Sequence, residues 1–367
     1  MIIRAKTKYL FEGKPLTPKQ QENSELNLAE IQQGATVLRS MPRRLVLELT
    51  NTCNLNCVMC GRNAATFKPT VFQMDWLYKL EPLLDTVEEV TLMGWGEPTV
   101  HPHFTEMLEV IHRHSARIYF CTNGMRLGQL HDAIFDNQVD VFAVSVDGAS
   151  AETNNAIRRG SDLEAIKTNL KRIVKTRRDR QLSYPYINFV FCAMKSNLHE
   201  LPDLVRLAAE IGLDEVKVVY LTAFDKAMEK ETLWDCQVEV ESVFQEATEL
   251  GEKLGVVLKL PYIQGQDPAG EALHRDCFVA WRDFFLGSDG MVRPCMSTPE
   301  QFFAFDPDKS FVEMWNSLEY QKYRAGVNDL KNMDNPCRHC YQSSHCNWNQ
   351  KSSFLQIGEF FSPEWIK

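Results

Sequence analysis

The sequence lacks any apolar run long enough to span a membrane, and its N-terminus, MIIRAKTKYLFEGK, lacks the apolar core of a secretory signal peptide. It is also short of positive charge: 40 Lys and Arg residues are outnumbered by 49 Asp and Glu residues, giving a formal net charge of −9. Non-specific nucleic-acid binding depends on Lys and Arg side chains that neutralise phosphates. We therefore expect a cytoplasmic protein that binds neither membranes nor nucleic acids.

Cysteine, in contrast, is plentiful, with eleven residues in a chain of 367. In a protein without an export signal, the reducing cytosol keeps thiols available to bind metal or to do chemistry. Most of these cysteines fall in two groups, one at Cys53–Cys60 and one from Cys277 to Cys346. Their clustering therefore indicates metal sites rather than a disulfide framework.

Short apolar runs alternate with amphipathic helical segments from Leu45 onward. Such alternation predicts parallel strands joined by right-handed helical crossovers. Units of this kind form an open, partial (β/α)6 version of the TIM barrel, an α/β fold in which chemistry is expected at the C-terminal ends of the strands. The expected strands are Leu45–Leu49, Val90–Met93, Arg117–Cys121, Val141–Val146, Ile187–Ala193 and Val216–Leu221.

Residues typical of helix starts and helix ends flank two of the helical segments between the strands. Ser161 and Glu164 form a capping-box pattern at the start of one helix. Gly212 is placed to end a helix over Leu201–Ile211. Residues 1–40 are polar and weakly periodic, which predicts a loosely attached arm.

Beyond the barrel, Gln237–Leu254 is expected to be a long helix and Val256–Leu260 a strand leading out of the barrel. The segment GQDPAG after Gln264 has the Gly, Pro and polar content of a linker. The predicted units are the arm at 1–40, the barrel at 41–225, a bridging helix, strand and linker at 226–270, a small α/β domain at 271–350 and a tail at 351–367.

Cys53, Cys57 and Cys60 lie in LVLELTNTCNLNCVMCG, spaced C-x3-C-x2-C directly after an expected strand. Three thiolates are one fewer than a cubane 4Fe–4S cluster has irons, so one iron keeps a position for a non-protein ligand. Zinc sites favour pairs of ligands that close a four-ligand tetrahedron, and no fourth Cys or His is near this triplet. The alternative is three buried apolar cysteines in a loop.

This triplet resembles the signature of the radical S-adenosylmethionine (SAM) superfamily. The resemblance implies that the open iron chelates the amino and carboxylate groups of SAM. Reduction by a flavodoxin- or ferredoxin-type donor then splits SAM into methionine and a 5′-deoxyadenosyl radical, which abstracts hydrogen from a C–H bond. The protein supplies orientation and excludes water.

The turn GWGEP follows the second expected strand and resembles the Gly-Gly-Glu-Pro motif of this superfamily, with Trp95 inserted. The resemblance implies that Gly94 and Gly96 let the backbone approach SAM and that Glu97 accepts a hydrogen bond from its ammonium group. An ordinary turn at the end of a strand is the alternative.

Further strand ends match the same pattern. Thr122 and Asn123 end the third strand, where the resemblance places them near the ribose or adenine. Ser145 and Asp147 end the fourth strand in SVDG, and the serine position resembles a contact to the SAM carboxylate.

Two more side chains complete the implied SAM site. Arg158, rather than its neighbour Arg159, is expected to pair with the SAM carboxylate through a charge-assisted contact. Met59 takes the place of the usual aromatic residue before the third cysteine, and its thioether can cover the adenine.

The second cysteine group resembles the SPASM/twitch auxiliary-cluster domains that follow many radical SAM barrels. It contains Cys277, Cys295, the C-x2-C pair Cys337 and Cys340, and Cys346. The resemblance implies one auxiliary 4Fe–4S cluster held by the first four of these. A zinc ribbon built from the same thiolates is the alternative.

This segment departs from a full SPASM domain, because Gln350 stands where a further cysteine is expected. Cys346 is therefore left over: it replaces Cys340 as a ligand, donates a hydrogen atom as a catalytic thiol, or packs in the core. Met314–Arg324 resembles the connecting helix of the family. The remaining cysteines are expected to be buried apolar residues: Cys121, Cys192 and Cys236.

A fully ligated auxiliary cluster has no open iron but can accept an electron from a substrate radical. We therefore expect a radical SAM oxidoreductase that dehydrogenates a small polar metabolite such as an aminosugar or a cyclitol. One alternative is a peptide maturase that crosslinks or epimerises residues. Another, of a different class, is a non-catalytic iron–sulfur or zinc-binding scaffold, in which the SAM-contacting residues would serve no purpose.

Overall fold

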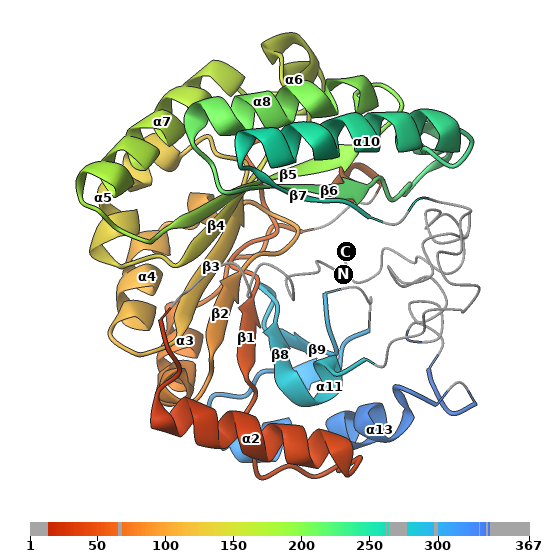
Figure 1. Ribbon diagram of the computed structural model, residues 1–367. Helices are drawn as coiled ribbons and strands as arrows, with labels where there is room; N and C mark the ends of the chain where they lie inside the picture. Colours follow the sequence, from red (N-terminus) through yellow and green to blue (C-terminus); the bar gives the residue numbers. More distant parts are fainter. Residues whose placement is uncertain are drawn as a thin grey trace.

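The computed structural model describes residues 14–64, 68–261, 263, 277–296, 300–329, 331–334 and 337. Its strands form one curved sheet in the order β10-β9-β8-β1-β2-β3-β4-β5-β6-β7, with helices along its outer side (Figure 1). Strands β8 and β1 to β7 pair in parallel, whereas β9 and β10 are antiparallel. The strands are β1 (Arg44–Leu47), β2 (Glu89–Leu92), β3 (Arg117–Thr122), β4 (Val141–Ser145), β5 (Tyr186–Ala193), β6 (Glu215–Tyr220), β7 (Val257–Lys259), β8 (Asp283–Leu286), β9 (Met291–Arg293) and β10 (Phe303–Ala304).

Helices alternate with the parallel strands, as the sequence predicts for a partial barrel. Those of the barrel are α3 (Met74–Leu80), α4 (Phe104–His112), α5 (Leu127–Asp136), α6 (Ala151–Ile157), α7 (Leu163–Asp179), α8 (Leu201–Ile211), α9 (Lys226–Glu229) and α10 (Gln237–Leu254). Short 3₁₀ turns lie at Gly61–Ala64 (η1), Glu81–Asp85 (η2), Pro98–Val100 (η3) and Leu198–Glu200 (η4).

Successive side chains of each strand point to opposite sides of the sheet. On the outer side, apolar residues such as Leu45, Leu47, Phe120 and Phe142 are fully buried in the core beneath the helices. On the inner side, Tyr119 and Ala143 belong to a separate small cluster with Met93. This inner side, which we call the lumen, carries the more polar set of residues.

The six predicted barrel strands are confirmed, but the edges of the sheet differ from expectation. The segment Val256–Leu260 does not lead out of the barrel: its core forms β7, which pairs in parallel with β6. At the other edge, β8 from the C-terminal segment pairs in parallel with β1, with Arg44 opposite Asp283. The C-terminal domain therefore begins as a continuation of the barrel sheet.

The long helix at Gln237–Leu254 and the end of α8 are confirmed, and Gly212 adopts the left-handed conformation with φ of 88°. The predicted capping box is wrong. Helix α7 begins one residue later, with Asp162 as its N-cap and its carboxylate accepting a hydrogen bond from the amide of Ala165. Asp is as good an N-cap as Ser, so the adjacent acidic residue takes the position.

The N-terminal segment is not a loose arm where it is described. Helix α2 (Pro18–Gln32) begins with a capping box and runs across one end of the sheet (Figure 1). Gln20 Nε2 donates to the carbonyl of Val87 at 2.8 Å, and Asn27 Nδ2 donates to that of Trp281 at 2.8 Å. The buried side chains of this helix are polar, so it shows no apolar periodicity in the sequence.

The C-terminal segment contributes α11 (Val279–Arg282), α12 (Phe311–Trp315) and α13 (Leu318–Gly326). The predicted single helix over Met314–Arg324 is therefore wrong: Ser317 starts a new helix by accepting from the amide of Tyr320. No helix in the described part of the chain is both long and apolar enough to cross a membrane.

Candidate active site at the cysteine loop

The three cysteines of the C-x3-C-x2-C motif lie on the loop between β1 and η1, at the C-terminal end of the sheet. All three side chains are half-buried, and none forms a disulfide. The loop is held against the end of α6, because Asn56 N donates to the carbonyl of Arg159 at 3.0 Å and Val58 N to that of Ile157 at 2.9 Å. The backbone on both sides of Cys57 is therefore fixed.

Burial raises the pKa of the Cys57 thiol to about 11, although the nearby Arg158 charge lowers it, and burial also raises the pKa of Cys53. A bound cation supplies the charge that stabilises such thiolates. Soft thiolate donors suit iron–sulfur clusters, so the donor set fits the predicted group. Among the described residues, no group of three or more Cys, His, Asp or Glu side chains is arranged as metal ligands.

The GWGEP turn packs directly on this loop. A Cβ on Gly96 would overlap the carbonyl oxygens of Thr50 and Thr52, and the amide of Glu97 donates to the Thr52 carbonyl at 2.8 Å. A Cβ on Gly94 would overlap the side chain of Glu48. Only glycine allows this close approach of the turn to its neighbours.

The Glu97 carboxylate is buried and joins the ends of β2 and β3. Its Oε1 accepts from the hydroxyls of Thr99 and Thr122, each at 2.6 Å, and its Oε2 accepts from the amide of Asn123 at 2.7 Å. Burial raises the pKa of Glu97, while these hydrogen bonds oppose that effect. Its expected contact with the SAM ammonium group would add a donor to a carboxylate that already holds two strand ends together.

Asn123 brings the end of β3 to the cysteine loop. Its Nδ2 donates to Asn54 Oδ1 at 2.8 Å and lies 3.7 Å from Cys53 Sγ. Its Oδ1 accepts from the amide of Met125 at 3.1 Å, so both ends of the side-chain amide are held by hydrogen bonds. The sequence did not single out Asn54.

Asp147 and Arg158 form a buried ion pair, with Oδ2 of the aspartate 2.7 Å from Nε of the arginine. The other carboxylate oxygen accepts from the amide of Cys192 at 2.7 Å. Burial raises the pKa of Asp147, and the Arg158 charge opposes that effect. Nη1 of Arg158 lies 4.0 Å from Cys57 Sγ, so the guanidinium lies between the carboxylate and the cysteine loop.

The remaining predicted SAM contacts are Ser145 and Met59. Ser145 Oγ is 3.6 Å from Cys121 Sγ. Met59 packs against a small apolar cluster that includes Ile157, Met194 and Leu221.

Of the second cysteine group, Cys277, Cys295 and Cys337 are described and half-buried, whereas Cys340 and Cys346 lie outside the described residues. Cys277 precedes α11, and its amide donates to Asn328 Oδ1 at 2.7 Å. Cys295 follows β9, and the next residue, Met296, packs against the lumen cluster of Met93 and Tyr119.

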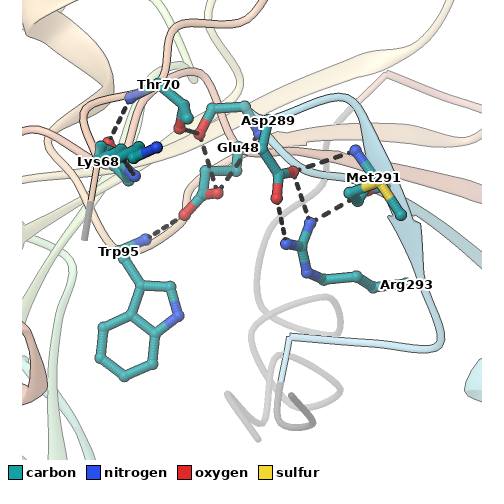
Figure 2. Close-up of polar contacts among 9 residues, drawn as sticks. Glu48, Lys68, Thr70, Trp95, Asp289, Met291 and Arg293 are labelled. Atoms are coloured by element: carbon teal, nitrogen blue, oxygen red, sulfur yellow. Dashed lines mark hydrogen bonds and ion pairs between the residues drawn. The ribbon is translucent and has the colours of Figure 1, made fainter. Parts of the chain in front are cut away.

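Sequence reasoning missed Glu48, a buried carboxylate at the end of β1 whose contacts are drawn in Figure 2. It accepts from the amide of Trp95 in the GWGEP turn and from Ser288 in the turn between β8 and β9. A charged residue between Leu47 and Leu49, directly before the cysteine motif, was the available signal.

Comparison with known proteins gives two domain matches. Residues 47–208 match the model of the radical SAM superfamily, and residues 277–341 match that of SPASM, an iron–sulfur cluster-binding domain. The chain therefore contains a radical SAM domain followed by a SPASM domain. A radical SAM domain holds a 4Fe–4S cluster with SAM, and a SPASM domain holds auxiliary iron–sulfur clusters, so the predicted cofactors are confirmed.

Three known proteins are similar in sequence to this chain. It is 24% identical to the tungsten-containing aldehyde ferredoxin oxidoreductase cofactor-modifying protein of Pyrococcus furiosus, over 76% of this chain and 82% of the relative. It is 23% identical to the AdoMet-dependent heme synthase of Methanosarcina barkeri, over 89% of this chain and 96% of the relative. It is 31% identical to the mycofactocin maturase of Mycolicibacterium smegmatis, over 47% and 43%, respectively.

Two solved structures share the fold of this chain at low sequence identity. Streptococcus suis SuiB bound to SAM has a TM-score of 0.63 at 15% identity, covering 92% of this chain and 81% of SuiB. Native anSMEcpe with bound AdoMet has a TM-score of 0.58 at 15% identity, covering 85% of this chain and 92% of that protein.

Proposed function

We propose that the protein is a radical SAM oxidoreductase that removes two electrons from a substrate in the barrel lumen and passes one of them to an auxiliary cluster. An external flavodoxin- or ferredoxin-type donor would supply one electron through the SAM-binding cluster. Cleavage of SAM would then give methionine and a 5′-deoxyadenosyl radical. The substrate gives this radical a hydrogen atom, forming 5′-deoxyadenosine. It then loses one electron to the auxiliary cluster and one proton to a base, which leaves a product with two fewer hydrogen atoms.

The position of the Cys295 segment carries this proposal. Met296, directly after Cys295, packs against the small cluster of Met93, Tyr119 and Ala143 on the lumen side of the barrel strands. A ligand at Cys295 would therefore hold its cluster beside the space in which a substrate radical forms. An auxiliary cluster placed there is suited to take an electron from that radical.

The residues of the chain have the following proposed tasks. Cys53, Cys57 and Cys60 hold the SAM-binding cluster, and the turn containing Gly94 and Gly96 brings backbone close to SAM. Arg158 carries positive charge to the side of Cys57 where a SAM carboxylate is expected. This arrangement orients SAM toward the lumen and excludes water from it.

The proposed substrate is a small polar metabolite such as an aminosugar or a cyclitol. In support, the lumen side of the strands carries hydrogen-bonding groups, including the half-buried Ser145 and the buried Lys217 and Tyr119. Such groups can orient hydroxyl or amino substituents so that one C–H bond faces the radical.

Peptide maturation is the second candidate. It is favoured by the names of the relatives, which include mycofactocin maturases, and by SuiB, which was also solved with its precursor peptide SuiA. A peptide would enter the same lumen, and the reaction would be a crosslink, an oxidation or an epimerisation of one residue.

The test is anaerobic incubation of the reconstituted protein with SAM, a reductant and candidate substrates from both classes. We expect 5′-deoxyadenosine to form together with a product two daltons lighter than an aminosugar or cyclitol substrate. The matched control is the Cys57→Ala variant, which should form neither. Unchanged mass with deuterium from solvent would indicate epimerisation instead, and a peptide product would favour the second candidate. Absence of 5′-deoxyadenosine under all conditions would contradict both.

A further inference from the structure

Glu48 divides its two carboxylate oxygens between the barrel and the C-terminal domain. Oε1 accepts from the amide of Trp95 at 2.7 Å, and Oε2 accepts from the hydroxyl of Ser288 at 3.1 Å (Figure 2). Its own amide donates to the carbonyl of Leu286 at 3.0 Å, which continues the pairing of β1 with β8. Glu48 is only 6% exposed, so the loss of one of these donors would leave a buried carboxylate oxygen without a hydrogen bond, at a cost in free energy.

On the barrel side, Glu48 fixes the GWGEP turn. A Cβ on Gly94 would overlap the Glu48 side chain, so the turn lies directly on the carboxylate. The Trp95 ring in turn packs against Phe224, with 5.7 Å between the ring centroids, and lies over Gly61. Gly61 follows Cys60, so the contact reaches the cysteine loop.

On the other side, Glu48 fixes the turn that leads to Cys295. The hydroxyl of Ser288 is also 2.7 Å from that of Thr70, which comes from the segment after the cysteine loop. The next residue, Asp289, pairs with Arg293 at 2.6 Å, and the Arg293 side chain is buried. Cys295 lies two residues beyond this ion pair.

We propose that Glu48 is a positioning residue that couples the SAM-binding turn to the segment that holds Cys295. A change on either side alters the hydrogen bonds of the same buried carboxylate, and such coupling is reciprocal for binding. The inference rests on the superfamily assignment and on Cys295 as an auxiliary-cluster ligand. It does not depend on which substrate is oxidised.

The test is a Ser288→Ala substitution in the reconstituted protein, read by hydrogen–deuterium exchange and by the dissociation constant for SAM. Glu48 is the direct hydrogen-bonded link between Ser288 and the Trp95 amide, whereas the path through Thr70, Thr50 and Thr52 reaches the turn at Glu97. We expect faster exchange at the Trp95 amide and about fivefold weaker SAM binding, the lower end of typical coupling. In a Glu48→Ala background, Ser288→Ala should add no further effect on either measurement.

The matched control is Ser24→Ala. It removes the same kind of buried bond, from Ser24 Oγ to Glu88 at 2.8 Å, before the start of β2 and far from the cysteine loop in sequence. We expect wild-type exchange at Trp95 and wild-type SAM affinity. The proposal is overturned if Ser288→Ala also leaves Trp95 exchange unchanged, or if the effects of Glu48→Ala and Ser288→Ala simply add. Should Glu48→Ala not fold, Trp95 exchange that is unchanged in Ser288→Ala, as in Ser24→Ala, still overturns the proposal.

Neither measurement requires turnover. A chain that oxidises none of the candidate substrates can still show the coupling, so failure of the proposed reaction and failure of this inference are distinguishable.

Discussion

The Nη1 atom of Arg158 lies 4.0 Å from the Sγ atom of Cys57. The same guanidinium is paired with Asp147 at 2.7 Å, and both members of the pair are buried. A fixed positive charge therefore lies beside the middle cysteine of the motif. It is placed to stabilise the thiolate and to attract an anionic group of a ligand bound there.

Arg158→Ala should reduce the free energy of unfolding by about 3 kcal/mol, because it leaves the Asp147 carboxylate buried without its partner. It should also weaken SAM binding. The double variant Asp147→Asn, Arg158→Ala should recover much of the stability but none of the affinity, which separates the two roles. Arg159→Ala serves as control, since that side chain is exposed. Wild-type SAM affinity in Arg158→Ala would contradict the proposed role.

Gly96→Ala should displace the cysteine loop, because the added Cβ would overlap the carbonyls of Thr50 and Thr52. We expect loss of iron from the SAM-binding cluster after anaerobic reconstitution, measured as iron per chain. Gly255→Ala is the matched control: its φ is 73°, but an added Cβ meets no atom within 4 Å. That variant should lose about 1 kcal/mol of stability and keep its iron.

Much of the fold could be predicted because the barrel strands are apolar on the side that faces the helices. The strand pattern placed β1 to β6, and Gly212 marked the end of α8 through its left-handed backbone. Helix α2 could not be found in this way, because its buried side chains, such as Gln20 and Asn27, are polar. Their hydrogen-bond partners are supplied by the folded chain and leave no local signal.

The site was only partly predictable for a similar reason. The motif residues follow strands whose ends meet at one edge of the sheet, so their proximity follows from the fold. The role of Glu48 depends on its hydrogen-bond donors Trp95 and Ser288, which lie 47 and 240 positions away in the sequence. Nothing near Glu48 in the chain indicates that β8 pairs beside β1 and brings Ser288 to it.

Asp283 should make stability depend on acid pH. Burial alone would raise its pKa, but ion pairs with Arg44 and Arg282 outweigh burial and lower the pKa to about 2. A lowered pKa in the folded state stabilises the fold above the unfolded value of about 4, and this contribution is lost as pH falls toward 2. Asp283→Asn should therefore cost about 2 kcal/mol at pH 7 and progressively less below pH 4.

The measurement is the free energy of unfolding of both proteins across this pH range. Asp203→Asn, which breaks an exposed pair with Arg206, should cost less than about 1 kcal/mol. An Asp283→Asn cost that stays constant down to pH 2 would contradict the assignment.

Cys57→Ala should abolish SAM cleavage and leave iron in the auxiliary site. Wild-type protein should hold about eight irons, as two 4Fe–4S clusters require, and this variant about four. Loss of all iron would argue against two independent clusters. About four irons with stoichiometric zinc in the wild type would favour a zinc ribbon.

Cys346→Ala should retain the full iron content, since the proposed auxiliary ligands are Cys277, Cys295, Cys337 and Cys340. If the iron content falls by half, Cys346 is a ligand. If the iron content is kept but product formation is lost, Cys346 is the catalytic hydrogen-atom donor.

The central claim is that Cys53, Cys57 and Cys60 hold a 4Fe–4S cluster whose open iron binds SAM. Electron paramagnetic resonance of the anaerobically reduced protein, recorded before and after SAM is added, tests this claim most directly. The account predicts a cluster signal whose g-values shift on addition of SAM. A signal that SAM leaves unchanged would contradict it.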